Sequence, residues 1–152
     1  MREIDEAWFP KLRLSGFRVT SPMTDAYNCI AWAANDTSHA WWPVQAEGWY
    51  WPSEAPMEQT VAAFVVAYGT RNFVPCDNPA PEKGFEKIAI YSDAHGSPLH
   101  AARQLASGRW TSKLGPMWDI EHMTLDAVEG PEYGSVCCYL KRPIAVPATT
   151  AD

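Results

Sequence analysis

The feature that most constrains the fold is a change of hydrophobic period near residue 87. Before it, Val61, Phe64 and Val65 recur at helical spacing inside an expected helix over 57–68. After it, short apolar runs bounded by turn residues predict strands. These expected strands cover residues 87–91, 99–105, 109–114 and 136–140. Helices followed by an antiparallel sheet predict an α+β fold, with N-terminal helices packed on a C-terminal sheet.

Length and charge limit the classes of protein to consider. The 152 residues suit one domain over 1–145, followed by a loose tail at 146–152. The 47% of hydrophobic residues can fill a core, and the net charge of -6 argues against nucleic-acid and anionic-membrane partners. No apolar run of about 18 residues predicts a spanning helix, and residues 1–6 lack a signal core. We therefore expect a cytoplasmic protein, with secretion by a signal-free route left open.

The four cysteines are expected to be free thiols. Cys137 and Cys138 are adjacent in an expected strand, so their side chains should point to opposite faces of the sheet. That arrangement favours a reducing compartment over disulfides. The cysteines and histidines lack the short paired spacings of a zinc site, and no glycine-rich phosphate loop is present. We therefore expect no metal and no cofactor.

Cys29 is the candidate nucleophile. Turn formers precede it and an expected helix covers 29–34, so the thiol lies in a first turn, where the helix dipole favours thiolate. His100 lies on the expected strand 99–105, which a turn at 106–108 pairs with strand 109–114. Asp119, just past that strand, or less favourably Ser112 on it, would orient His100. The pattern predicts a Cys29–His100–Asp119 triad.

The order of these elements resembles the papain-like superfamily in its broad sense, including NlpC-type peptidases and transglutaminase-like folds. The resemblance covers roughly residues 20–142. Four runs also look like an uncharacterised bacterial domain family: residues 27–34, 100–105, 108–115 and 119–122. The superfamily packs a cysteine-bearing helix against a histidine-bearing sheet. The resemblance therefore implies a cysteine hydrolase or acyl transferase (peptidase, amidase or deamidase type), with a peptide, amide or protein substrate.

The chain departs from the papain pattern at the oxyanion donor. Met23 stands six positions before Cys29, where that pattern has glutamine. The substitute expected here is the Cys29 backbone N–H with the Asn28 side chain. Four tryptophans are expected to frame the cleft: Trp32, Trp41, Trp42 and Trp110.

Each candidate also has a structural interpretation. Cys29 alone is more often core packing, and Asp119 is more often a helix cap that accepts early backbone N–H bonds. The aromatic segment Trp41–Trp51 can line a ligand groove or cover the core. The alternative function is therefore a binding module or inactive relative that recognises a protein partner through Trp41–Trp51. A toxin-like effector is a further alternative, by analogy alone.

Overall fold

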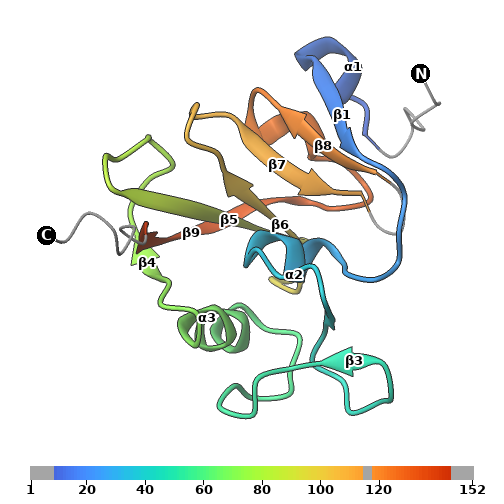
Figure 1. Ribbon diagram of the computed structural model, residues 1–152, viewed down its shortest axis with the longest axis vertical. Helices are drawn as coiled ribbons and strands as arrows, with labels where there is room; N and C mark the ends of the chain where they lie inside the picture. The colour runs from blue at the N-terminus through green and yellow to red at the C-terminus, as the bar shows by residue number, and fades with distance from the viewer. Residues whose placement is uncertain (1–8, 115–117, 145–152) are drawn as a thin grey trace, which may run out of the picture.

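A seven-stranded antiparallel sheet organises the computed structural model, which describes residues 9–114 and 118–144. Its strands lie in the order β1-β8-β7-β6-β5-β9-β4. They are β1 (Phe17–Ser21), β4 (Val74–Cys76), β5 (Phe85–Ser92), β6 (Pro98–Gln104), β7 (Trp110–Lys113), β8 (Asp119–His122) and β9 (Ser135–Pro143). A small parallel pair, β2 (Ala40–Trp41) and β3 (Trp49–Tyr50), lies below the sheet in Figure 1.

Both faces of the sheet are covered. The first face carries α2 (Cys29–Ala33), α3 (Val61–Gly69) and the β2–β3 region, as Figure 1 shows. The second face carries α1 (Leu12–Ser15) and the 3-10 helix η1 (Leu125–Val128). Each face therefore has its own core. The first core includes Ile30, Trp41, Phe64, Ile88, Ile90, Ala101 and Leu140. The second core includes Phe9, Leu12, Tyr91, Ala102, Trp110, Ile120 and Tyr133.

The two longer helices begin at side-chain caps. Asn28 Oδ1 accepts the Ala31 N–H at 3.1 Å at the start of α2, and Thr60 Oγ1 accepts the Ala63 N–H at 3.2 Å at the start of α3. Such caps satisfy backbone donors that a helix leaves unpaired. The helix predicted over 57–68 is confirmed in type, but it starts later, at Val61, because Thr60 provides the cap.

The predicted α+β fold class, with N-terminal helices packed on a C-terminal sheet, is wrong. The fold is mostly β, and its helices are short. The edge strands of the sheet, β1 and β4, lie outside the predicted strands. The expected cap at Asp119 is also wrong, because Asp119–His122 is strand β8, paired with β1 and β7. The predicted tail at 146–152 lies outside the described residues.

A β-bulge in β9 overturns the expectation for the adjacent cysteines. Ile90 pairs with Cys138 and Tyr91 pairs with Val136, so Cys137 has no partner residue on β5. Val136 packs toward the second core and Cys138 toward the first, although two residues separated by one usually share a face. The extra residue breaks the alternation of side chains along the strand. The expectation that Cys137 and Cys138 point to opposite faces is therefore wrong, since their Sγ atoms lie 4.0 Å apart.

None of the helices in the described part of the chain has the length and apolarity needed to cross a membrane.

Candidate functional site

Cys29 is the first residue of α2 and packs into the first core. The residue is only 8% exposed, and Sγ lies 4.0 Å from the Leu99 carbonyl oxygen. Burial raises the pKa of the thiol to about 11, although backbone N–H groups and the Lys113 charge oppose the rise. The structure therefore gives Cys29 the surroundings of a packing residue and not of a thiolate.

His100 lies on the other face of β6. Its ring stacks on Tyr133 with centroids 3.8 Å apart and meets the Tyr91 ring edge-on at 5.1 Å, inside the second core. The structure therefore does not bring Cys29 and His100 together. The order of elements that predicted the triad is correct, but α2 covers the face to which Ala101, and not His100, points.

His100 instead begins a buried chain of hydrogen bonds with Ser112 and His122. Ser112 Oγ lies 3.0 Å from His100 Nε2 and 2.8 Å from His122 Nε2, and His122 Nδ1 lies 2.8 Å from the Thr124 carbonyl oxygen. Because a carbonyl only accepts, His122 donates from Nδ1, and Ser112 donates to His122 Nε2. His100 then donates from Nε2 to Ser112. Its Nδ1 atom has no hydrogen-bond partner within residues 9–114 and 118–144.

Burial keeps both imidazoles neutral. It lowers the pKa of His122 to about 4, although the Thr124 carbonyl acts in the opposite direction. Burial, and then the neighbouring His122, lower the pKa of His100 well below its usual value. Ser112 and His100 are fully buried. Ser112 and the two histidines therefore form a buried hydrogen-bond network in which each proton has a defined position, and a substrate cannot reach it in this structure.

Asp119 lies on the first face, where it cannot orient His100. Its Oδ2 accepts the Tyr27 hydroxyl at 2.5 Å, while Oδ1 has no hydrogen-bond partner among the described residues. Burial and this hydrogen bond raise the pKa of Tyr27. Lys113, the cross-strand partner of Asp119, lies 5.1 Å over the Tyr27 ring. Sequence reasoning missed both residues, because the β7–β8 register places Lys113 beside Asp119 and the loop between β1 and α2 brings Tyr27 to it.

The residues proposed for the oxyanion hole and cleft are engaged in the fold. The Asn28 amide accepts from Ala31 and binds the Trp41 backbone in both directions, at 2.7 and 2.9 Å. Trp32 Nε1 donates to Thr111 Oγ1 at 3.0 Å. Trp110 lies on the opposite side of the sheet, in the second core.

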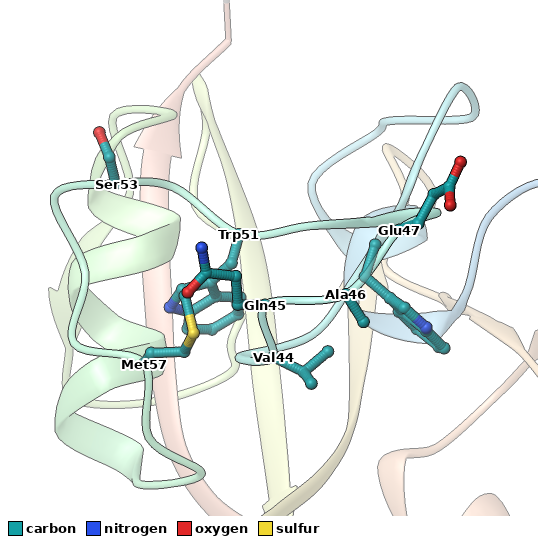
Figure 2. A pocket seen from close by; sticks show the side chains of 8 residues that line it. Val44, Gln45, Ala46, Glu47, Trp51, Ser53 and Met57 are labelled. Atoms are coloured by element: carbon teal, nitrogen blue, oxygen red, sulfur yellow. The ribbon is translucent and has the colours of Figure 1, made fainter.

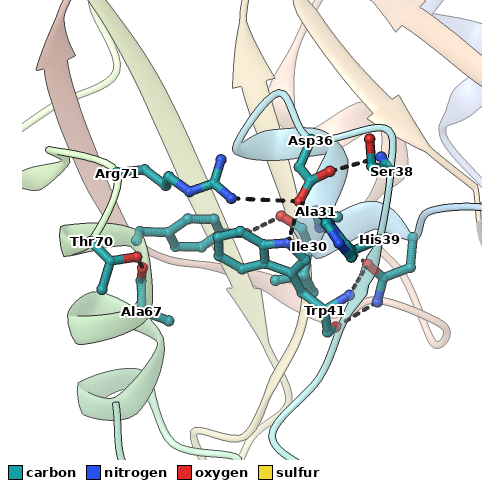
Figure 3. A network of polar contacts seen from close by, with 11 residues as sticks. Ile30, Ala31, Asp36, Ser38, His39, Trp41, Ala67, Thr70 and Arg71 are labelled. Atoms are coloured by element: carbon teal, nitrogen blue, oxygen red, sulfur yellow. Dashed lines mark hydrogen bonds and ion pairs between the residues drawn. The ribbon is translucent and has the colours of Figure 1, made fainter. Parts of the chain in front are cut away.

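A second region with functional potential is the tryptophan segment, residues 40–57. Figure 3 shows its anchor: the fully buried Trp41 donates from Nε1 to Asp36 Oδ2 at 2.8 Å, and Arg71 lies 4.9 Å over the Trp41 ring. Asp36 also contacts His39 Nδ1 at 3.1 Å and accepts the Ser38 N–H at 2.7 Å. Burial raises the pKa of Asp36, but hydrogen bonds, that from Trp41 first, outweigh burial and lower it.

Two further tryptophans of the tryptophan segment pack against α3. Trp42 and Trp51 pack on Phe64, with ring centroids 5.8 and 5.1 Å away. Trp51 Nε1 also donates to the Pro56 carbonyl at 2.9 Å. The inner side of the segment is therefore fixed by packing, which leaves its outer side available for contacts.

That outer side forms an open hollow of about 540 Å³. Figure 2 shows the side chains around it: Val44, Gln45, Ala46, Glu47, Trp49, Trp51, Ser53 and Met57. Three of them are large apolar residues left in solvent, with Val44 37%, Trp49 46% and Met57 51% exposed. A cluster of exposed apolar side chains around a hollow is typical of an interaction surface.

The comparison with known protein families assigns the chain to one of them. A family described as Domain of unknown function (DUF7689) matches residues 18–141. The chain belongs to this family. No curated protein and no solved structure matches it. The matched range spans the whole sheet except the first residue of β1 and the last two residues of β9, together with α2, α3 and the tryptophan segment.

Proposed function

We propose that this protein is a binding module whose hollow in the tryptophan segment receives a peptide segment of a partner protein. The observation that carries the proposal is the group of exposed Val44, Trp49 and Met57 side chains on a rigidly anchored support. Anchoring lowers the entropy lost on binding, because the support is ordered before the partner arrives. The cysteine-hydrolase and effector activities stay predictions of the sequence.

The negative charge around the hollow favours a positively charged peptide. Residues 40–60 contain three glutamates (Glu47, Glu54 and Glu58) and no lysine or arginine. Glu47 itself lines the hollow. A peptide with a large apolar side chain beside lysine or arginine would therefore meet both an apolar wall and a complementary charge. We commit to this apolar-basic class of peptide.

A titration with two short peptides tests the proposal. One peptide amide has phenylalanine between two lysines, and the control has phenylalanine between two glutamates. We expect the Trp49 indole N–H resonance to shift with the first peptide and not with the second. Higher salt should weaken the first interaction, because exposed charges are screened.

Matched variants localise the binding. Met57→Ala should weaken binding about fivefold or more, the effect of losing an interface contact worth about 1 kcal/mol. Met123→Ala is the control, since Met123 is 49% exposed but lies directly after β8, away from the tryptophan segment in the sequence. Glu47→Gln should weaken binding about two- to fivefold. Equal binding of both peptides, or equal losses in the two methionine variants, would overturn the proposal.

A further inference from the structure

The bulge in β9 brings two thiols together on the surface. Cys137 Sγ and Cys138 Sγ lie 4.0 Å apart. Cys137 is exposed and Cys138 is half-buried. Neighbouring side chains of a regular strand point away from each other, so this contact depends on the bulge.

The two sulfurs are chemically different. Hydrogen bonds from the Cys138 thiol and, more weakly, the Ser92 hydroxyl lower the pKa of Cys137, although burial opposes them. The same contact with Cys137, and then burial, raise the pKa of Cys138. The contact therefore favours the thiolate at Cys137 and the protonated thiol at Cys138.

We propose that Cys137 and Cys138 form a bidentate binding site for a thiophilic centre, of the class of trivalent organoarsenic compounds. A metal–sulfur bond measures about 2.3 Å, so two sulfurs 4.0 Å apart reach one central atom without a large movement of the backbone. Thiolates are soft ligands and select soft centres. The inference does not depend on the peptide-binding proposal.

The ligand count favours this class. Within 9–114 and 118–144, no group of three or more His, Cys, Asp or Glu side chains is placed to hold a metal ion. A tetrahedral zinc site needs four ligands, whereas an organoarsenic centre brings its own carbon ligand and needs two sulfurs. The protein supplies these two sulfurs.

The binding step balances without a change of oxidation state. An arsenic(III) oxide carrying one organic group reacts with both thiols, and two arsenic–sulfur bonds replace the bonds to oxygen. The two thiol protons leave with that oxygen as water. Cys137 attacks first as thiolate, after giving its proton to solvent; the arsenic-bound oxygen takes up one proton from solvent and one from Cys138 as Cys138 closes the ring and water leaves.

The test is a titration of the reduced full chain with phenylarsine oxide, followed by a count of the remaining thiols. We expect one arsenic per chain and the loss of two of the four thiols. Cys137→Ser and Cys138→Ser should each weaken binding at least about tenfold. Cys76→Ser, on the neighbouring strand β4, is the control and should leave both numbers unchanged.

A second measurement separates a built site from the chemistry of any adjacent cysteine pair. A synthetic peptide of residues 133–142 carries the same two cysteines without the sheet that holds the bulge. The folded chain should bind phenylarsine oxide at least about tenfold more tightly than this peptide, because its sulfurs are already close. Equal affinities, or full binding by Cys137→Ser, would overturn the inference.

Discussion

Ser112 Oγ lies 2.8 Å from His122 Nε2 at a point in the second core that solvent does not reach. The same oxygen accepts from His100 at 3.0 Å, so a single hydroxyl joins two neutral imidazoles. Such a network is stable only while both rings stay uncharged, because the interior has no solvent to stabilise an imidazolium ion.

Acid should therefore destabilise the fold through these histidines. An unfolded histidine has a pKa of about 6.5, whereas burial lowers the pKa of folded His122 to about 4. The unfolded chain then binds more protons, so stability is complete above about pH 6.5 and falls as the pH decreases toward 4. His122 alone should cost on the order of 3 kcal/mol over this range.

Urea denaturation at pH 7.5 and pH 5 measures the effect. His122→Gln should flatten the dependence on pH, even though the variant starts less stable. His95→Gln is the control, since His95 is exposed in the loop between β5 and β6. An unchanged slope in His122→Gln would show that other groups control the acid transition.

The surroundings of His100 agree with the sequence prediction in one respect and differ from it in another. The hairpin was predicted correctly: strand 99–105 and strand 109–114 correspond to β6 and β7, and a polar residue of the second strand, Ser112, contacts His100. Period-two alternation indicates which residues share a face, but not which face a helix will cover. In the structure α2 covers the first face and His100 points to the second, so Cys29 and His100 lie on opposite sides of the sheet.

Other errors have the same kind of cause. Asp119 and Glu121 are poor strand formers, and only pairing with β1 and β7 makes Asp119–His122 a strand, so tertiary contacts override local preference. The β9 bulge is also invisible in the sequence, because register is set between strands. The strands at 87–91 and 136–140 were confirmed, since their apolar runs are continuous.

The order in which the thiols react is a further prediction. Iodoacetamide near neutral pH should modify Cys137 first, because it is exposed and its pKa is lowered by Cys138. Cys29 should react last, because it is buried and its pKa is raised to about 11. Mass mapping over time gives the order, and rapid modification of Cys29 in the folded chain would restore it as a candidate nucleophile.

Gly134 provides a sharp test of the turn before β9. Its φ of +73° lies in the left-handed region, and an added Cβ would collide with the carbonyl oxygen of Ser92. Gly134→Ala should therefore cost about 3 kcal/mol or more, since backbone strain and a steric clash add. Gly96→Ala is the matched control: its φ is +84°, but no atom of the described part of the chain lies within 4 Å of the added atom. There we expect about 1–2 kcal/mol, and equal losses in chemical denaturation would contradict the clash.

Phe64 joins the stability of the fold to the proposed function. It is fully buried on α3, and both Trp42 and Trp51 rest against its ring. Phe64→Ala should cost about 3–5 kcal/mol, the range for a large aromatic residue removed from a core. Because the cavity that this substitution leaves lies under the tryptophan segment, Phe64→Ala should also lose peptide binding at temperatures where it is still folded.

The control is Val66→Ala, on the exposed side of the same helix, which should change stability by less than about 0.5 kcal/mol and leave binding intact. A folded Phe64→Ala protein that binds the lysine-flanked peptide normally would show that the hollow does not depend on this support, and circular dichroism melts with the peptide titration decide between the two outcomes.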